Sequence, residues 1–586
     1  MIDFCNTNSI WSSILVETLI RLGLTTVIIC PGSRSTPLTV AFTRNKKVTA
    51  IPVLDERSAA FFALGIAKKS GLPVALVCTS GTAGANFYPA IIEARESRVP
   101  LLILTADRPS ELRDCHSGQT IDQVKLYGNY PNWQTELAVP SLEIEMLNYL
   151  RQTIIYAWEK SLFPVAGAVH INLPFRDPLA PIPQPEAEAL ALKFSLDDFW
   201  AGMGENINYK IDNNIDLNYH INKWKKTQKG IIIAGVAQPH LAKEYCQAIA
   251  TLSQALKWPV LAEGLSPIRN YSQLNPYLIS TYDIILRYQE LTQKLPPEIV
   301  IQIGDFPTSK QLRNWLTSAQ IHRWIIDPTY QNLDPLHGKT THLRISIENL
   351  SEKISSPENL HHITNPYLQL WLNTETKIKQ TIAKTMASIE NIIEPKISWL
   401  ISQILPPETP IFIANSMPVR DVEFFWNVNN NRFKPFFNRG ANGIDGTLST
   451  ALGIAHQNQS SVMLTGDLAL LHDTNGFLIR NKFIGHLTII LINNNGGGIF
   501  EMLPISKYNP PFEEFFATPQ NIDFAQLCAT YGIDYELIIN WQQLSEKLNP
   551  LPRQGIRVLE LRTNRQADAL WRQNNLGKFA IESVIL

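Results

Sequence analysis

The sequence predicts an α/β protein built from three doubly wound, parallel-sheet domains. Short runs of β-branched residues recur along the chain, and each ends in small or turn-forming residues before a segment of helical length. Buried parallel strands joined by helices have this pattern. The chain has 586 residues, 45% hydrophobic and 18% charged, which is about three to four times the usual domain size and enough apolar material for several cores.

Nine apolar runs along the chain are predicted to be strands. They are TTVIICPGS (25–33), AIPVLD (50–55), PVALVCTSG (73–81), PLLILTADRP (100–109), KGIIIAGVA (229–237), EIVIQIGDF (298–306), TPIFIANS (409–416), SVMLTGD (461–467) and LTIILINNN (487–495). Two stretches of linker composition interrupt them, a proline-rich one at 171–189 and a polar one at 351–366. Together they predict domains at residues 1–185, 190–355 and 366–586, each of ordinary size.

An internal repeat relates the first and third domains. The pentapeptide ALGIA occurs at 63–67 and again at 451–455, each time within a helix-like segment. A strand ending in threonine follows each copy, and the next apolar strand begins 22 residues after that threonine in both, at Leu101 and Leu487. Matched spacing over a helix and two strands predicts duplicated domains, whereas the middle domain lacks this pattern.

Charge and cysteine content exclude several classes of protein. Lys plus Arg (51) nearly equals Asp plus Glu (52), with no Lys/Arg run longer than two, so neither nucleic acid nor an anionic membrane is an expected partner. Six scattered cysteines without CxxC spacing argue against a disulfide framework. The N-terminal segment lacks the basic start of a secretory signal, and the longest apolar runs are too short to span a bilayer. A cytoplasmic protein is expected.

Polar residues follow two strands of the predicted third domain. One strand ends in Gly466 and Asp467, and the next is followed by three asparagines, including Asn494, and by glycines from Gly496 onward. Carboxylate, amide and main-chain oxygens suit a magnesium or manganese ion that also holds a diphosphate, and glycines let the backbone approach phosphate. Ordinary strand-to-helix turns have the same composition, and the spacing of the two turns favours the metal site.

This spacing resembles the thiamine diphosphate (ThDP) signature, a GDG-type turn followed about 25 to 30 residues later by paired asparagines, with Leu468 replacing the last glycine. Six motifs are similar to those of one subfamily, the 2-succinyl-5-enolpyruvyl-6-hydroxy-3-cyclohexene-1-carboxylate (SEPHCHC) synthases of the MenD type. They are CPGSRSTPL (30–38), DERSAAFFALGIAK (55–68), TADRPSELRD (105–114), NSMPVRD (415–421), NRGANGIDG (438–446) and GDLALLHD (466–473). The resemblance covers all three domains and is thinnest in the middle one.

The resemblance implies the fold, cofactors and activity. The three domains would be pyrimidine-binding, central and diphosphate-binding, in that order, and the cofactors would be ThDP with Mg²⁺ or Mn²⁺. Members decarboxylate 2-oxoglutarate and add the resulting succinyl carbanion in 1,4 fashion to isochorismate, on the route to menaquinone or phylloquinone. Their cofactor lies between the first domain of one subunit and the third domain of another, so the chain would form a homo-oligomer, a dimer or a tetramer.

The resemblance also assigns cofactor residues. Glu56 matches the glutamate that bonds the pyrimidine ring, and burial would raise its pKa and favour proton exchange. Ile444 matches the apolar residue beneath the bent cofactor, Asp467, Asn494 and Gly496 match the metal ligands, and Gly466 lies in the cofactor-binding turn. Without the resemblance, Glu56 beside Arg57 is an ordinary charge pair at a helix start, and Ile444 an ordinary core residue.

Arginines at strand ends indicate an anionic substrate. Arg34, Arg108, Arg420 and Arg439 each follow a strand or a turn, and guanidinium groups bind carboxylates bidentately; any single one could equally be a solvated surface residue. In the family, the positions matching Ser416, Arg420 and Arg439 face 2-oxoglutarate. Those facing isochorismate match Ser33, Arg34, Arg108, Gln119 and Lys310.

Two other functions remain open at this point. One is another ThDP-dependent decarboxylase or carboligase acting on a smaller 2-oxo acid, similar to acetolactate synthase, which would leave Arg34, Arg108 and Arg420 without anionic partners. The other is a non-catalytic nucleotide-binding homologue, which would have no reason to keep Glu56, Asp467 and Asn494 together. The middle segment GIIIAGVAQPH contains no GxGxxG, so neither a flavin nor a nicotinamide is expected there.

Overall fold

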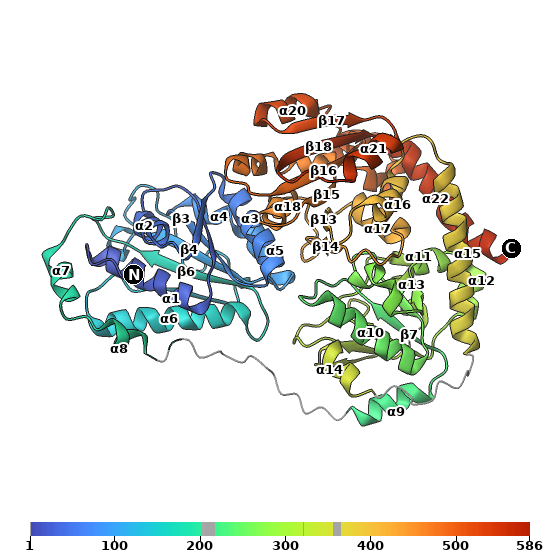
Figure 1. Ribbon diagram of the computed structural model, residues 1–586, viewed down its shortest axis with the longest axis horizontal. Helices are drawn as coiled ribbons and strands as arrows, with labels where there is room; N and C mark the ends of the chain where they lie inside the picture. The colour runs from blue at the N-terminus through green and yellow to red at the C-terminus, as the bar shows by residue number, and fades with distance from the viewer. Residues whose placement is uncertain (1, 202, 204–216, 320, 355–364, 586) are drawn as a thin grey trace. The chain divides into compact units, whose positions relative to one another are not determined.

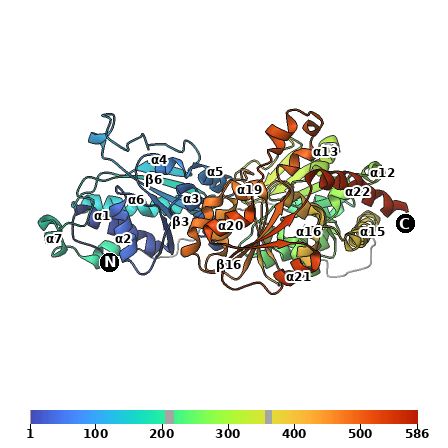
Figure 2. The ribbon, with the colours of Figure 1, turned by 90° about the horizontal axis from the view of Figure 1, so that it is seen from above.

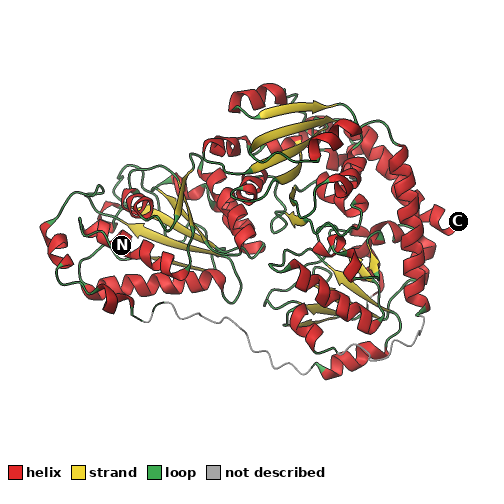
Figure 3. Ribbon diagram, in the orientation of Figure 1, coloured by secondary structure: helices red, strands yellow, loops and turns green. Residues whose placement is uncertain are grey.

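Three six-stranded parallel sheets form the framework of the protein. The computed structural model describes residues 2–201, 203, 217–319, 321–354 and 365–585. Figure 3 shows strands flanked by helices in each sheet, and every described pairing between these strands is parallel. The predicted α/β class with three parallel sheets is therefore confirmed. Most of the polar linker predicted at 351–366, namely 355–364, lies outside the described residues.

The first and third sheets have the same strand order. The first is ordered β2-β1-β3-β4-β6-β5 and the third β14-β13-β15-β16-β18-β17, which become identical when the third sheet is renumbered from its own first strand. The first contains β1 (Thr26–Ile29), β2 (Thr49–Pro52), β3 (Val74–Cys78), β4 (Leu101–Asp107), β5 (Trp133–Glu136) and β6 (Ala168–Pro174). The third contains β13 (Pro410–Ile413), β14 (Lys434–Phe436), β15 (Ser461–Gly466), β16 (His486–Asn493), β17 (Asp534–Ile538) and β18 (Gly555–Arg562). This shared topology agrees with duplication.

The middle sheet has a different topology. It is ordered β12-β11-β10-β7-β8-β9, the strand order of a dinucleotide-binding fold read from the other end. Its strands are β7 (Gly230–Ala234), β8 (Val260–Ala262), β9 (Leu278–Ile279), β10 (Ile299–Ile303), β11 (Arg323–Ile326) and β12 (Thr340–Leu343). All five positions of β7 and of β10 are buried, which explains why these two strands read as continuous apolar runs.

Helices connect the strands and cover the sheets (Figure 1). Those preceding, within and following the first sheet are α1 (Thr7–Leu22), α2 (Thr36–Arg44), α3 (Glu56–Ser70), α4 (Thr82–Ala85), α5 (Tyr88–Glu96), α6 (Ile144–Leu162), α7 (Pro185–Ala191) and α8 (Leu196–Trp200). The middle domain adds α9 (Asn218–Lys226), α10 (Ala242–Leu256), α11 (Tyr282–Ile285), α12 (Gln289–Lys294), α13 (Lys310–Ala319) and α14 (Ile347–Glu352). The last part of the chain adds α15 (Pro366–Ser388), α16 (Glu394–Ile404), α17 (Met417–Phe425), α18 (Thr447–Ala455), α19 (Asp467–Leu471), α20 (Phe524–Tyr531), α21 (Trp541–Leu548) and α22 (Arg565–Ile585).

The described residues fall into two compact units. The first unit comprises the chain before the middle domain together with Asn438–Asn458 and Ala469–His486, and the second comprises the rest. The first unit therefore contains α18, although the third sheet belongs to the second unit. Within the second unit, α15 and α22 lie side by side in both views (Figures 1 and 2) and share one hydrophobic core.

The proline-rich stretch at 171–189 is not a free linker. Its first residues complete β6, in which every position is buried, and its last residues begin α7. Phe199 and Trp200 of α8, further along, are buried in the same core as the first sheet. Proline tolerates both settings, because it occupies a strand end in one and the first turn of a helix in the other. Among the described residues, no helix is both long and apolar enough to cross a lipid bilayer.

The two ALGIA segments pack against each other inside the first unit. A Cβ atom on Gly65 of α3 would lie 2.1 Å from the carbonyl oxygen of Thr450, and one on Gly453 of α18 would lie 2.1 Å from that of Phe62. The Cα atom of either glycine would be 3.0 Å from a Cβ placed on the other. The contact is thus reciprocal, as expected for duplicated helices that meet about a local two-fold axis, and it requires glycine on both sides.

We expect Gly65→Ala to lower the free energy of unfolding by about 1–3 kcal/mol, because the new methyl group meets a backbone carbonyl that cannot rotate away. Gly577→Ala is the matched control, since Gly577 also lies within a helix but a Cβ there meets nothing within 4 Å. That control should raise stability by about 0.5–1 kcal/mol through helix propensity. Thermal and denaturant unfolding measure both. Equal effects of the two substitutions would contradict the close helix contact.

Candidate active site

Several of the predicted site residues follow the strands at which the strand order reverses. In doubly wound sheets, ligands bind beyond the carboxyl ends of the strands at this point. The reversal falls between β1 and β3 in the first sheet and between β13 and β15 in the third. Ser33 and Arg34 follow β1, Ser416 follows β13, and Asp467 follows β15, so two corresponding edges of the duplicated fold carry the candidates.

Asp467 and the glycine loop after β16 are held together. Strands β15 and β16 are paired, with Gly466 opposite Ile492, which places their ends side by side as the sequence predicted. The main-chain N–H of Gly496 donates to Asp467 Oδ2 over 2.8 Å. Burial raises the pKa of Asp467 to about 6. Gly496 has φ +144°, and a Cβ there would lie 2.4 Å from the carbonyl oxygen of Ala517, so this position requires glycine.

Asn494 presents a buried oxygen without a hydrogen-bond partner. Its Nδ2 donates to Glu394 Oε1 over 2.6 Å, while its Oδ1 is buried and accepts from no group in the described part of the chain. The Asn494 amide oxygen and the Asp467 carboxylate are hard oxygen donors, and the glycine loop can add main-chain carbonyl oxygens of the same kind. Such a set fits Mg²⁺ or Mn²⁺.

The helix that carries Ser416 and Arg420 is anchored by two buried ion pairs. Asp421 of α17 pairs with Arg572 of α22, with two contacts of 2.8 and 2.5 Å. Two residues further along, Glu423 pairs with Arg269 of the middle domain at 3.3 Å. All four side chains are 1–2% exposed. These pairs fix α17 within the second unit on two sides.

Ser416 and Arg420 are half-buried residues at the start of this helix. Ser416 precedes the helix with φ +72° and ψ −128°, a region that is strained for a residue with a side chain. The Arg420 guanidinium donates to the Ser416 carbonyl oxygen over 2.6 Å. Strain directly after a strand, with a guanidinium folded over it, is typical of a ligand-binding turn.

The start of α3 holds Glu56 in the first unit. On one side, Asp55 caps the helix by accepting from the Ser58 N–H at 3.0 Å and is itself bonded by Asn475. On the other, Arg57 donates to the main-chain oxygen of His472 at 2.9 Å. Glu56 is half-buried, and burial, with a smaller contribution from Asp55, raises its pKa. The residues on both sides of Glu56 are therefore held by hydrogen bonds.

The loop containing Arg439 and Ile444 is held by Glu93 of α5. This buried carboxylate accepts the main-chain N–H groups of Gly440 and Ala441 at 3.0 and 2.7 Å, and it lies 3.8 Å from the buried ammonium group of Lys68. Burial lowers the pKa of Lys68 to about 8. Ile444 lies half-buried further along the same loop, within the first unit.

Arg34, Arg108 and Gln119 gather around the end of β3. The main-chain N–H of Arg34 donates to Thr79 Oγ1 at 3.2 Å. Arg108 donates to Ser80 Oγ and, over 2.7 Å, to the Gln119 carbonyl oxygen, and the Gln119 amide donates to the Ser80 carbonyl. Burial, and after it the nearby Arg34 guanidinium, lower the pKa of Arg108. Two neighbouring guanidinium groups are a natural receptor for a multiply charged anion.

Not every predicted residue joins these clusters. Ser33 is exposed in the loop between β1 and α2. Lys310 begins α13 and is exposed; like Ser416 and Arg420 it belongs to the second unit, whereas Arg439 belongs to the first. Gly466 borders open space, since a Cβ there would meet nothing within 4 Å.

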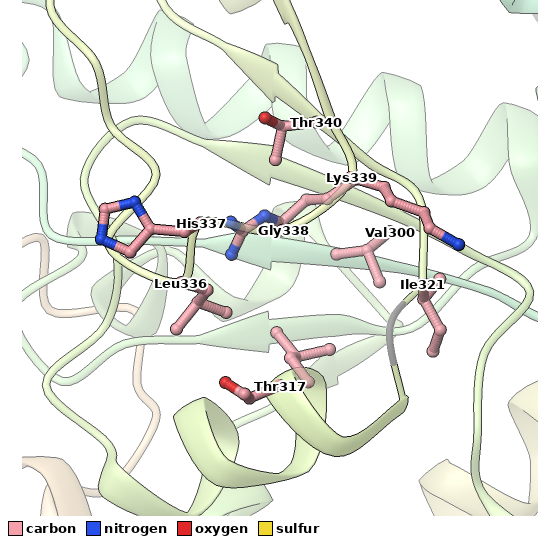
Figure 4. Close-up of a pocket in the computed structure, with 10 residues that line it drawn as sticks. Val300, Thr317, Ile321, Leu336, His337, Gly338, Lys339 and Thr340 are labelled. Carbon is pink, nitrogen blue, oxygen red and sulfur yellow. The ribbon is translucent and has the colours of Figure 1, made fainter.

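A pocket in the middle domain is distinct from these clusters. Figure 4 shows it lined by Val300, Lys339 and Thr340 among others. Thr340 begins β12, and Lys339 precedes it. The pocket therefore opens at the amino ends of strands, the edge opposite to the one where Lys310 lies.

Sequence reasoning missed the residues that hold the candidates in place. Ser80 and Glu394 accept hydrogen bonds from the candidates Arg108 and Asn494. Glu93 accepts one from Gly440, next to Arg439, and Arg572 in turn donates to Glu394. Glu394 resembles an ordinary acidic residue in the first turn of a helix, and Arg572 an ordinary helical arginine. Their burial, 1% exposed in each case, is the property that distinguishes them, and no motif signals it.

Comparison with known proteins identifies the family. Residues 11–126 match the family described as "Thiamine pyrophosphate enzyme, N-terminal TPP binding domain", residues 195–413 match "Middle domain of thiamine pyrophosphate", and residues 422–559 match "Thiamine pyrophosphate enzyme, C-terminal TPP binding domain". A protein of Gloeothece citriformis named SEPHCHC synthase is 66% identical over 581 residues, 99% of this chain and 100% of that protein. The chain belongs to the SEPHCHC synthase family. A relative of the same name from Trichormus variabilis is 64% identical over 586 residues, covering both chains completely.

Solved structures share the fold at low sequence identity. A putative ThDP-dependent enzyme from Mycobacterium smegmatis superposes with a TM-score of 0.67 at 15% identity, over 94% of this chain and 99% of that one. A ThDP-dependent 4-hydroxybenzoylformate decarboxylase from Rhodococcus jostii gives 0.69 at 14% identity, with the same coverage. The fold that the SEPHCHC synthase family implied from sequence is thus found in other ThDP-dependent enzymes.

Proposed function

We propose that this chain is a SEPHCHC synthase that decarboxylates 2-oxoglutarate and transfers the succinyl unit to isochorismate, in menaquinone or phylloquinone biosynthesis. The full-length relatives of that name support this reaction. The observation that carries the substrate assignment is the pair of neighbouring guanidinium groups, Arg34 and Arg108, at the carboxyl edge of the first sheet. A monocarboxylate such as pyruvate would offer only one carboxylate to these two guanidinium groups. Arg34 also lies 3.9 Å from the carboxylate of Asp177.

The cofactor residues follow from the donor set at the third sheet. Asp467, Asn494 and the main-chain carbonyl of Gly496 would hold Mg²⁺ or Mn²⁺, and the glycine loop would face the diphosphate. When bound, ThDP supplies a nucleophilic carbon and an electron sink for decarboxylation. The half-buried Glu56 carboxyl group, with its raised pKa, would exchange a proton with a ring nitrogen of the cofactor. Ile444 would supply an apolar surface beneath the cofactor.

The remaining residues would bind the two substrates separately. Ser416, Arg420 and Arg439 would bind 2-oxoglutarate, with the guanidinium groups pairing with its distal carboxylate. Ser33, Arg34, Arg108, Gln119 and Lys310 would bind isochorismate. We further propose a cytoplasmic homo-oligomer in which the cofactor lies between the first domain of one subunit and the third domain of another, as in the family.

Release of CO₂ tests the reaction directly. With ThDP and Mg²⁺, we expect slow CO₂ release from 2-oxoglutarate alone and a large increase when isochorismate is added, because the second substrate removes the carbanion equivalent. Product formation is followed by mass spectrometry. Pyruvate as the preferred donor, with no response to isochorismate, would favour the small-substrate carboligase instead.

Replacing Glu56 by Gln should preserve the fold and ThDP binding but remove most turnover, since an amide cannot exchange the required proton. Exchange of the thiazolium C2 proton, followed by NMR, is the decisive measurement. Glu145→Gln, an exposed glutamate in the first turn of α6, is the matched control and should behave as the wild type. Wild-type exchange rates in Glu56→Gln would remove Glu56 from the proposed role.

The arginine groups should separate by substrate. Arg420→Ala should impair formation of the first adduct with 2-oxoglutarate. Arg34→Ala and Arg108→Ala should leave that step nearly intact. Each should weaken the binding of isochorismate by about 1–3 kcal/mol, roughly ten- to a hundredfold in affinity. Stopped-flow detection of the adduct, followed by isochorismate titration, measures the two steps. The exposed Arg553, replaced by Ala, serves as the control, and equal damage to adduct formation by Arg34→Ala and Arg420→Ala would refute the two-sided pocket.

A further inference from the structure

A buried cluster of charges lies next to the proposed metal ligand Asn494. It contains Glu394 at the start of α16, Asp421 of α17, and Asp568 and Arg572 of α22, each 1–2% exposed. Three carboxylates thus surround one guanidinium group in the second unit. The cluster reaches the carboxyl edge of the third sheet through Glu394, which accepts from Asn494 after β16 and from Thr563 after β18.

The side-chain amide of Asn494 has a single favourable orientation. Its Nδ2 donates to Glu394 Oε1 over 2.6 Å, and a carboxylate can only accept at this contact. If the amide flipped, two oxygens would face each other at that distance. Gly498 leaves room for the amide, since a Cβ there would lie 2.6 Å from Asn494 Nδ2. The carboxylate of Glu394 therefore directs the opposite atom, Oδ1, away from itself.

Glu394 is itself held in place from the other side. Its Oε2 accepts from Arg572 Nη2 over 2.6 Å, and its Oε1 accepts from the Thr563 hydroxyl over 3.2 Å. Arg572 also makes two contacts with Asp421. A side chain with both oxygens bonded and almost no exposed surface has one rotamer, so the direction of the Asn494 amide is determined by the packing of three helices.

We propose that Glu394 is a positioning residue that directs the amide oxygen of Asn494 toward the cofactor's metal ion, with Arg572 holding Glu394. The proposal rests on the proposed function, because it presumes that Asn494 ligates Mg²⁺ or Mn²⁺. The role proposed for Glu394 is to determine which end of the Asn494 amide faces the metal ion. An amide offers a cation either an oxygen, which binds it, or an NH₂ group, which repels it, and Glu394 selects the oxygen.

Direct measurement of bound Mn²⁺ tests this role without relying on turnover. The full-length protein is titrated with Mn²⁺ in the presence of ThDP, and free Mn²⁺ is followed by electron paramagnetic resonance. We expect Glu394→Ala to weaken the binding of Mn²⁺ roughly ten- to a hundredfold. Loss of a group that orients a metal ligand typically has an effect of this size. The variant should fold, because Arg572 keeps its two contacts with Asp421; circular dichroism checks this, and Glu394→Gln is the second variant if it does not.

A second substitution distinguishes orientation from general structural support. Asp has two equivalent oxygens and needs no orienting partner, so Asn494→Asp introduced into Glu394→Ala should restore Mn²⁺ affinity to within a few fold of the wild type. In the wild-type background, the same substitution should weaken binding, since it places two carboxylates in contact. If Glu394 only stabilises the fold, Asn494→Asp would rescue nothing.

Matched controls separate the possible outcomes. Thr563→Val removes another hydrogen bond to the same oxygen of Glu394 but leaves the bond to Asn494, and should change Mn²⁺ affinity by about twofold or less. Wild-type affinity in Glu394→Ala, or no rescue by Asn494→Asp, would overturn the positioning role while leaving the proposed function standing. Failure of the wild type to bind ThDP with Mn²⁺ would overturn both.

Discussion

The ion pairs of the Arg572 guanidinium group are the interactions on which the carboxyl edge of the third sheet, with the candidate metal ligands, depends. They join α22 to α17 through Asp421 and to α16 through Glu394, so the last helix of the chain connects the turn of Ser416 with the loop of Asn494. Breaking a buried pair of this kind costs about 3–5 kcal/mol, because the remaining charge is left without a partner. The exposed ion pair of Arg432 and Glu408 contributes about 1 kcal/mol or less to the free energy of unfolding. The buried cluster therefore determines where the candidate ligands lie.

The fold was predictable from sequence where complete burial makes a strand apolar at nearly every position. Every predicted apolar run contains a strand, because strands buried on both faces must be apolar at nearly all positions. Strands β5, β12 and β17 were missed, since they are short, contain polar residues and lie at sheet edges, where water can satisfy one side. Strand β6 was missed because its final proline, Pro174, belongs to a stretch that has the composition of a linker. Strands β8, β9, β11, β14 and β18 were missed as well; β8 and β11 are buried at every position but have only three and four residues.

Only those residues of the candidate site that belong to a sequence motif were predictable. Asp467 and Asn494 were placed at neighbouring strand ends from their spacing, and the structure has them there. The residues that orient them are buried polar side chains with partners distant in sequence, and a buried glutamate such as Glu394 reads the same as a surface one. Family resemblance supplied the roles of Glu56 and Ile444, for which residue chemistry alone gives an ordinary explanation.

The reciprocal contact of Gly65 and Gly453 restricts how the sequences of the two related domains can diverge. After a duplication, most positions can change separately, and the two carboxyl edges differ accordingly. One gathers arginines, and the other carries a glycine loop with the candidate metal ligands. Positions that touch their own copy are different, because a change in either one meets the backbone of the other. The glycine of each ALGIA segment is therefore restricted by the backbone of the other segment, so neither can be replaced without a shift of its neighbour.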